Sequence, residues 1–428
     1  MKPIHTMKLF AITSLAAITI AVLLSGCGAT RSSAHRPAAL RTASKIDSRV
    51  EKARRMLSKQ PNDLAALLEF GSVAMQKGRE TGDLQWYVDG RKAFEKAVAL
   101  HPEEPVAQHR LAYALTIFHQ FGSAIRHARR AVAASPYDDE AWGVLSDAYT
   151  ELGQYEKALD ATQKMLDAKP SLAAYSRAAH LRWVYGDPVG AMEMMARAIQ
   201  AGAGFEEHVA WCRVQLADMA LKTGNLKLAR EQYELALEAT PMSKPAHAGV
   251  ARLLRSEGSL AKAIDHLEIA TDGMTQIPYL AELGDLYREI GDEAKATATH
   301  ARIPTLIASH RSFGVYGDEL NLASFWLDHD LHIDQALALV ESEVSDHTSV
   351  QAYSTLAWAY FKAGRFEEAD RAMKRALRHG TRDAVLMSRA AQIRHALGDR
   401  KAARSLAAEA LAMNPYLHDA RAREIAQG

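Results

Sequence analysis

The sequence is short of cysteine and carries no excess of either charge. Only Cys27 and Cys212 occur among its 428 residues, so no intrachain disulfide is possible if a modification consumes Cys27. Lys and Arg together number 52, and Asp and Glu 51. A chain so balanced has no overall field that would attract nucleic acid. Because hydrophobic residues make up 48% of the chain, which is ample for a folded core, we expect a folded protein with no nucleic-acid partner.

Common catalytic motifs are missing as well. The sequence has no G-x-x-x-x-G-K-[ST], H-E-x-x-H, G-x-S-x-G or C-x-x-C, so we predict no enzyme activity, no cofactor and no metal. The most metal-like segment is DHDLHID at 328–334. It spans a predicted helix–helix turn, where Asp and His commonly cap helices or face solvent, and a divalent-ion site is the alternative interpretation. Cys212 lies in an apolar helical pattern and is expected to be a small buried hydrophobic residue, with a reactive thiol as the alternative.

Long hydrophobic runs are also absent, apart from one near the N-terminus. Leu9 to Leu24 forms an uncharged stretch of 16 residues, whereas a membrane-spanning helix needs about 20. Lys2 and Lys8 precede it, and small residues follow it. This arrangement is typical of a secretory signal peptide, predicted here for residues 1–26, with an uncleaved anchor helix as the alternative.

The end of that run has a more specific pattern. Leu24-Ser25-Gly26-Cys27 resembles the lipobox of bacterial lipoproteins. The resemblance implies that Cys27 is lipidated and becomes the N-terminus of the mature protein, since the thiol is the best available nucleophile and several acyl chains give a stable anchor. Gly28 follows in place of the Asp that commonly signals retention in the inner membrane. We therefore expect an envelope protein, anchored in the outer membrane and facing the periplasm.

Residues 27–45 have no apolar period and read as a flexible tether. Eight basic residues lie between Arg31 and Arg55; such a run is expected either to be a solvated linker and first helix or to rest on anionic head groups. A second basic run, at 371–382, is expected to be the solvated outer face of a helix, with docking to an acidic partner or lipid as the alternative.

Glycine and alanine recur beyond the tether in the spacing G-x-x-x-x-A. Successive glycines from Gly153 to Gly291 lie 33, 38, 34 and 33 residues apart, a period that indicates a repeat architecture. The pairs are Gly153/Ala158, Gly186/Ala191, Gly224/Ala229, Gly258/Ala263, Gly291/Ala296, Gly364/Ala369 and Gly398/Ala403.

One repeat, at 141–170, explains the period. Apolar residues at helical spacing form a first stripe, Gly153 supplies a turn because it reaches positive φ cheaply, and a second stripe ends at Pro170. Ser146 and Ala158 are small where the two helices must cross closely. The repeat is therefore predicted to be a helix–turn–helix.

The pattern resembles the tetratricopeptide repeat (TPR), a 34-residue helix–turn–helix. The resemblance implies an all-α solenoid over 46–428, a right-handed superhelix of about ten repeats with an inner groove. Stacking supplies the core, and capping helices are expected at 44–59 and 417–426. The repeats are 64–102, 105–136, 139–170, 172–204, 210–241, 244–274, 277–303, 317–346, 350–381 and 384–415.

Three departures leave boundaries open. The first repeat has about seven extra residues near 78–90. The join at 303–317 is irregular and predicts an extended helix with a kink, and the eighth repeat has Leu331 where others have Gly.

In a tetratricopeptide array the first helix of each repeat lines the groove, and positions 2, 5, 9 and 12 point inward. Because aromatic and Arg side chains most often anchor interfaces, the residues at these positions predict a groove for an extended or helical protein segment, with Arg and Asp at its centre. The alternative is that Trp183, Trp211 and Trp358 fill gaps between helices. The predicted groove residues are His109, Tyr113, Asp147, His180, Trp183, Trp211, Asp218, Arg252, Arg255, Asp285, Arg288, Phe325, Asp328, Trp358 and Phe361.

Together the two resemblances imply an envelope-anchored scaffold that binds a protein or peptide partner, as bacterial TPR lipoproteins do in the assembly of envelope or secretion complexes. The alternative is a periplasmic lipoprotein that binds a small ligand or glycan in the groove.

Overall fold

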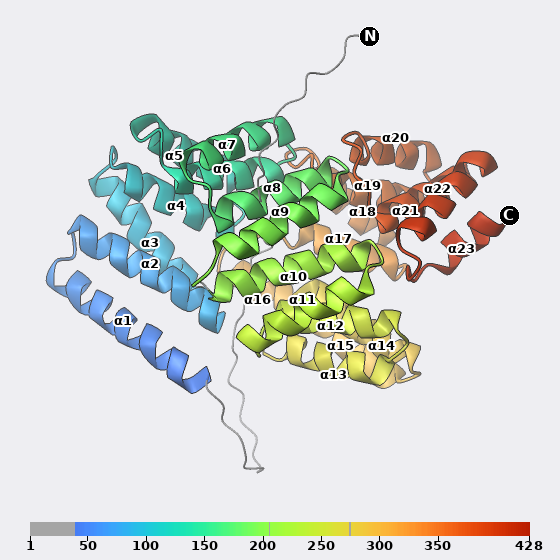
Figure 1. Ribbon diagram of the computed structural model, residues 1–428, viewed down its shortest axis with the longest axis horizontal. Coiled ribbons are helices and arrows are strands. Elements are labelled where there is room, and N and C mark those ends of the chain that lie inside the picture. The colour runs from blue at the N-terminus through green and yellow to red at the C-terminus, as the bar shows by residue number, and fades with distance from the viewer. Residues whose placement is uncertain (1–38, 205, 274) are drawn as a thin grey trace, which may run out of the picture. The chain divides into compact units, whose positions relative to one another are not determined.

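The structure is a computed structural model that describes residues 39–204, 206–273 and 275–428. All regular structure in these ranges is α-helical, in twenty-three helices (Figure 1). The helices are α1 (Ala39–Lys59), α2 (Leu64–Thr81), α3 (Leu84–Leu100), α4 (Pro105–Ile117), α5 (Phe121–Ala134), α6 (Asp139–Glu151), α7 (Tyr155–Ala168), α8 (Leu172–Val184), α9 (Pro188–Ala201), α10 (Glu206–Lys222), α11 (Leu226–Ala239), α12 (Lys244–Ser256), α13 (Leu260–Thr271), α14 (Ile277–Glu289), α15 (Glu293–His300), α16 (Arg302–Ser312), α17 (Glu319–Asp328), α18 (Ile333–Glu343), α19 (Val350–Lys362), α20 (Phe366–Ala376), α21 (Ala384–Ala396), α22 (Arg400–Met413) and α23 (Ala420–Gln427).

The helices follow the predicted repeats, which confirms the all-α tetratricopeptide architecture. Ten repeats run from α2–α3 to α21–α22, with α16 added after the seventh, and α1 and α23 flank them. Helix starts are capped by short polar side chains; for example, Asp63, Ser171 and Ser349 each accept a hydrogen bond from the backbone N–H three residues on. Such caps satisfy N–H groups that have no partner inside the helix.

The alanine of each G-x-x-x-x-A pattern is fully buried. All seven of these alanines, from Ala158 to Ala403, are 0% exposed. Ser146, predicted to lie at a close crossing, is 1% exposed, and its hydroxyl is hydrogen-bonded to the Thr162 hydroxyl at 2.5 Å. Small residues are required here because a larger side chain would separate the paired helices.

The departures from the pattern have physical explanations. The extra residues of the first repeat lengthen both of its helices, to 18 and 17 residues. In the eighth repeat, where Leu331 replaces Gly, the flanking residues Asp330 and His332 take positive φ values of 55° and 46°. Asp and His tolerate this region better than most residues do.

The join after the seventh repeat also behaves as predicted. An extended second helix is interrupted at Ala301, between α15 and α16. Pro304 lies in the first turn of α16. Because proline has no backbone N–H to donate to the carbonyl four residues earlier, the helix is broken at this place.

The start of α1 corrects the predicted tether. The helix begins at Ala39, so the stretch 39–45 is helical and not part of a flexible linker. Pro37 lies just before it, and proline is commonly found immediately before or at the first turn of a helix. The predicted signal peptide 1–26, Cys27 and the tether up to residue 38 lie outside the described residues.

The described residues form two compact units. Unit 1 contains 145–263 and 322–428, and unit 2 contains 39–144 and 264–321. Each is therefore assembled from two stretches that lie far apart in the sequence. The units are described separately below.

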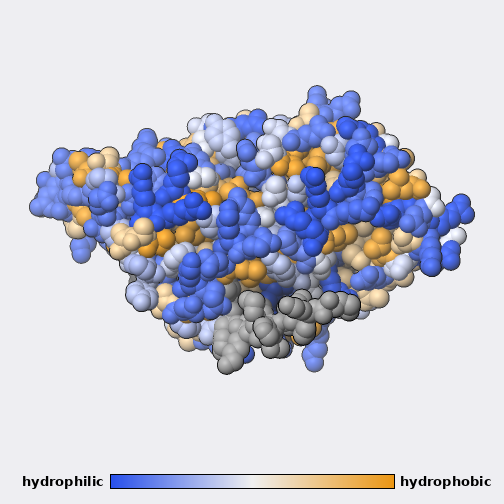
Figure 2. Space-filling view, turned by 90° about the horizontal axis from the view of Figure 1, so that it is seen from above, coloured by the Kyte–Doolittle hydropathy of each residue, from blue (hydrophilic) through white to orange (hydrophobic). Residues whose placement is uncertain are grey.

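The surface is largely polar. Figure 2 shows a face that is mostly hydrophilic and interrupted by small hydrophobic areas. Within the described ranges, no helix combines the length and the apolar character needed to cross a membrane.

Cys212 is completely buried, and burial raises the pKa of its thiol to about 12, against the opposing effect of a hydrogen bond with Ser176. The thiol is therefore protonated at neutral pH, which agrees with a structural role.

Candidate functional site

In unit 2, two of the predicted groove residues lie on α4. His109 is 6% exposed, and its Nδ1 lies 2.5 Å from Asp138 Oδ2 and its Nε2 3.3 Å from Glu140 Oε2. Burial lowers the pKa of His109, but the two carboxylates outweigh it and raise that pKa above 6.5. His109 therefore links the second repeat to the third. Tyr113 lies nearby on the same helix and accepts a hydrogen bond from Arg79 at 3.3 Å.

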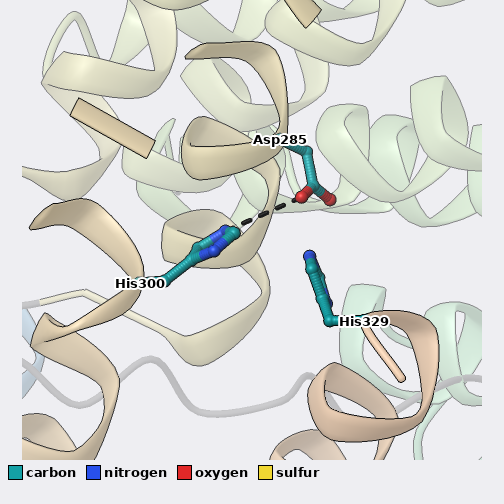
Figure 3. Close-up of side chains that lie close together, drawn as sticks. All are labelled: Asp285, His300 and His329. Carbon is teal, nitrogen blue, oxygen red and sulfur yellow. Dashed lines mark ion pairs between the residues drawn. The ribbon is translucent and has the colours of Figure 1, made fainter. Parts of the chain in front are cut away.

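Asp285 and Arg288 lie on α14, also in unit 2. Arg288 forms ion pairs with Asp285 at 3.5 Å and with Glu293 at 3.6 Å. Figure 3 shows the second contact of Asp285, an ion-pair distance of 3.6 Å to His300 Nε2. The His300 ring lies against Gly284, where a Cβ atom would come within 2.1 Å of its Nε2. The acidic and basic groups on this helix therefore have partners within their own repeat.

In unit 1, Asp147 is held by an arginine from the next repeat. Asp147 is 3% exposed, and Arg177 on α8 donates to both of its oxygens, with Nε 2.6 Å from Oδ1. Burial raises the pKa of Asp147 to about 6, although Arg177 acts to lower it. The carboxylate is therefore ionised at neutral pH and is engaged in a buried, two-pronged ion pair.

Two neighbouring groups have strongly shifted pKa values. Glu151 lies one helical turn after Asp147, and burial together with the Asp147 charge raises its pKa to about 7. Burial and the charge of Lys222 lower the pKa of His180 to about 4. Glu151 is thus partly protonated and His180 is neutral at pH 7, so this part of unit 1 carries less charge than its residue types suggest.

The two tryptophans of the fourth and fifth repeats differ in exposure. Trp183 is 9% exposed, with the Lys222 ammonium 5.7 Å from its ring centre. Trp211 on α10 is half-buried. Trp183 therefore packs between helices to a large extent, as the alternative interpretation predicted, whereas part of Trp211 stays accessible.

Asp218 on α10 and Arg252 on α12 lie close together in unit 1. Asp218 accepts a hydrogen bond from Tyr233 Oη at 2.5 Å, and its Oδ1 lies 3.8 Å from Arg252 Nη1. Arg252 and Arg255 are half-buried on α12. Asp218 and Arg252 thus link the fifth repeat to the sixth, and the predicted pairing of the central arginines with a bound segment stays a prediction.

The densest group of predicted residues lies on α17, α19 and α21, and we name it the aromatic–arginine cluster. It consists of Asp328, Trp358, Phe361 and Arg389. Trp358 donates its Nε1–H to Asp328 at 2.8 Å and is stacked on Phe361, with ring centres 4.8 Å apart and planes 9° apart. Arg389 lies over the Trp358 ring at 4.9 Å and donates to Asp328 at 2.9 Å.

Phe325, one turn before Asp328, is 8% exposed and contacts the ring of His329, which Figure 3 also labels. Phe325 is thus largely a packing residue. The aromatic–arginine cluster thus combines one carboxylate, one guanidinium and two flat rings.

Three polar residues of the metal-like segment 328–334 have contacts with other side chains. Asp328 belongs to the aromatic–arginine cluster, Asp330 pairs with Lys362 at 2.7 Å, and the His332 ring contacts Trp326 with centres 5.2 Å apart. These contacts agree with the interpretation of the segment as a turn.

The basic run 371–382 is likewise engaged within the chain. Lys374 pairs with Asp370 at 2.8 Å, and Arg378 donates to the carbonyls of Gly153 and Thr348. The run therefore includes an internal contact that neither the solvated nor the docking interpretation anticipated.

Residues that the sequence-based prediction missed lie at position 6 of their repeats. Arg177 and Arg389 both occupy this position, and each reaches an aspartate of an earlier repeat. The recurrence of Arg at one register position could have indicated them. The prediction also missed Glu151 and Lys222, which lie one turn after the predicted residues Asp147 and Asp218 on α6 and α10. No recurring residue type at their register position indicates them.

Comparison with protein families supports the repeat assignment. Models described as tetratricopeptide repeat match residues 118–180, 214–275 and 350–381. These stretches of the chain are tetratricopeptide repeats, which form a scaffold fold, and none of the three models describes an enzyme. Comparison with curated protein sequences finds no match.

Several solved structures are similar in part. TTC0263, a thermophilic TPR protein of Thermus thermophilus, is 22% identical, covering 45% of this chain and 100% of that protein, with a TM-score of 0.40. PilW, a type IV pilus biogenesis factor, is 19% identical over 48% of this chain and 94% of its own, with a TM-score of 0.40. Human IFIT1, solved with PPP-AAAA, is 16% identical over 80% of each chain, with a TM-score of 0.47. Likenesses of this size say nothing about which partner this TPR chain binds.

Proposed function

We propose that this protein is an envelope-anchored scaffold lipoprotein. It is lipidated at Cys27, lies at the outer membrane facing the periplasm, and binds a protein or peptide partner through its first helices during assembly of an envelope or secretion complex. The lipobox-like stretch 24–27 supports the anchor, and the tetratricopeptide fold supports the binding role.

The main support for the proposed binding surface is the aromatic–arginine cluster. Tryptophan and arginine are the residues most enriched among interface anchors. Trp358 and Arg389 are already oriented by their bonds to Asp328. Trp358 itself is 8% exposed, so the half-buried Phe361 and Arg389 present the accessible part of the cluster. Side chains held in advance lose less conformational entropy on binding, so this part of the cluster is suited to anchor a partner segment.

The second element of the surface is the pair Arg252 and Arg255 on α12. Their guanidinium groups offer charge to an acidic group of the same segment. Truncating an anchor costs about 2 kcal/mol or more in binding, which corresponds to roughly 30-fold in affinity.

The test begins with co-purification of partners from detergent-solubilised envelopes. The double variant Arg252→Ala with Arg255→Ala, and separately Trp358→Ala, should each weaken binding of a recovered partner by at least about 30-fold. The matched control is Arg371→Ala with Lys374→Ala, two exposed cations on the second helix α20, which should bind like the wild type. Unchanged affinity in the first two variants, with the fold intact by circular dichroism, would move the binding site to the outer helices or the tether.

A second candidate function is binding of a glycan or other small ligand. The parallel stack of Trp358 on Phe361 is the observation that favours it, because flat aromatic rings can pack against a sugar face. Calorimetry of the purified protein with envelope oligosaccharides distinguishes the two. Saturable binding that Trp358→Ala abolishes, without any protein partner in the co-purification, would favour the glycan.

A further inference from the structure

The two stretches of unit 1 meet along a row of polar contacts, which we name the seam. On one side are the turns that follow α6, α8 and α10, at 152–155, 184–186 and 221–224. On the other side are the loops that precede α19, α21 and α23, at 348–350, 378–383 and 414–415. Three bonds recur along it: Thr348 Oγ1 donates to the Leu152 carbonyl at 3.0 Å, Thr381 Oγ1 to the Val184 carbonyl at 2.5 Å, and Asn414 Nδ2 to the Leu221 carbonyl at 3.4 Å.

The seam is regular. The bonded residues are separated by 196, 197 and 193 positions in the sequence. A nearly constant separation means that three successive repeats on one side meet three successive repeats on the other, each in the same register. The contact therefore follows from the geometry of the repeats, because it recurs in three successive repeats.

Further polar contacts strengthen the seam. The backbone N–H groups of Thr348 and Val350 donate to Leu152 O at 3.2 Å and to Tyr155 Oη at 2.9 Å. Arg378 Nη2 donates to the Gly153 carbonyl at 3.3 Å. Lys222 Nζ lies 3.4 Å from Asp383 Oδ2, and the His379 ring lies edge-on to Tyr155 and Tyr185, with centres 5.1 and 5.2 Å away.

The glycines of the turns reveal how close the two sides are. A Cβ atom on Gly153 would lie 2.3 Å from the Thr348 backbone, and one on Gly186 would lie 2.1 Å from the Gly380 carbonyl oxygen. Gly258 occupies the same place in its repeat with a similar φ of 77°, yet a Cβ atom there would meet nothing within 4 Å. Two seam glycines therefore permit a backbone approach that the repeat itself does not require.

The acceptors in the seam are carbonyls at the ends of helices. Such carbonyls have no partner inside the helix, and water satisfies them well when no side chain does. Breaking the seam therefore exposes polar groups that water can solvate, whereas separating two paired helices would expose fully buried alanines. Opening of the seam would therefore expose less apolar surface than the separation of two paired helices.

We propose that the seam is a closure that opens to admit the partner segment to unit 1. The inference rests on the proposed binding function, because Lys222 Nζ lies 5.7 Å from the ring centre of Trp183, a predicted groove residue, and 3.4 Å from Asp383 on the other side of the seam. While the seam is shut, the ends of α6, α8 and α10 are held against the facing loops. When it opens, Lys222 is released from Asp383 and the Trp183 ring that it covers becomes accessible to the partner segment.

Hydrogen exchange on the full chain tests whether the seam opens separately. The amides of Thr348 and Val350 should exchange at least about tenfold faster than amides inside α7, and at least about tenfold slower than an unprotected amide. Gly153→Ala should accelerate both seam amides by about tenfold or more, because its Cβ atom would collide with the Thr348 backbone. Gly258→Ala places the same strain in a turn outside the seam and should leave them unchanged. Equal protection in the seam and in α7, or no protection in the seam, overturns the proposal.

A disulfide across the seam tests whether opening of the seam controls access to the tryptophan side chains. Because the Thr348 backbone N lies 3.2 Å from the Leu152 carbonyl O, the double variant Leu152→Cys with Thr348→Cys is designed to join the two sides by a disulfide, and loss of free thiols checks that the bond has formed. Quenching of tryptophan fluorescence by acrylamide should fall when this disulfide forms and return on reduction, and the difference should shrink in a Trp183→Phe background. The same quenching in both redox states overturns the proposal.

Neither measurement uses a partner. Failure of the Arg252 and Arg255 variants to weaken binding would therefore count against the proposed function alone, and failure of the disulfide test would count against the closure alone.

Discussion

Replacing Glu151 with glutamine tests how the charge of this carboxylate affects the free energy of unfolding. Glu151 ends α6, four residues after Asp147. Burial, with a smaller contribution from the Asp147 charge, raises its pKa from 4.5 to about 7. Glutamine has nearly the same shape and cannot ionise, so the variant removes the charge and keeps the packing.

The pH dependence follows from the direction of this shift. Because the folded state holds the proton more tightly than the unfolded state, Glu151 costs the fold nothing below pH 4.5. The free energy of unfolding then decreases as pH rises toward 7, where folded Glu151 loses its proton, and it levels off above that. A shift of about 2.5 units corresponds to roughly 3 kcal/mol at most. Partial solvent access to Glu151 reduces this value, so we expect Glu151→Gln to be more stable than the wild type by about 1–2 kcal/mol at pH 8 and equal to it at pH 4.5.

The assay is urea unfolding of wild type and variant at pH 4.5, 6 and 8, followed by far-ultraviolet circular dichroism. Glu156→Gln is the matched control, since Glu156 is exposed at the start of the next helix and its replacement should change the free energy of unfolding by less than about 0.5 kcal/mol. A gain for Glu151→Gln that does not change with pH, or a loss of stability at pH 8, would refute the assignment of a buried carboxylate.

Three further outcomes are expected. Cys27→Ser should leave unprocessed precursor or release soluble protein, and a mutant that is still processed and membrane-bound on fractionation would exclude lipidation. Deletion of 384–428 should leave a helical but less stable protein that aggregates through the exposed face of the ninth repeat, because repeat stability is roughly a sum over neighbours; complete loss of helical circular dichroism would contradict this. Gly71→Ala should destabilise by about 1–3 kcal/mol, since its Cβ atom would lie 2.3 Å from the Phe94 ring, whereas Gly122→Ala, with open space around it, should be neutral or slightly stabilising in a thermal melt.

The helices and their pairing could be predicted because the signals for them are local. Helical spacing, a turn glycine and a buried alanine all lie within one 34-residue repeat, so Gly153 and Ala158 suffice to place α6 and α7. The kink before α16 was predictable for the same reason, since Pro304 acts on the carbonyl four residues earlier. The candidate site was predictable only in part. The register of the repeat indicates which face Trp358 and Asp328 share, but not that Arg389 crosses two repeats to reach them.

The seam and the shifted pKa values belong to the tertiary structure alone. Thr348 and Leu152 are 196 residues apart, and the acceptors in the seam are backbone carbonyls, which every residue type possesses. No pattern of side chains therefore marks the contact. The pKa of Glu151 likewise depends on how much solvent the surrounding helices exclude, which is a property of their packing. The repeat sequence specifies each helix pair through short-range sterics, whereas the contacts between distant repeats arise only when the small rotation at each interface accumulates along the array.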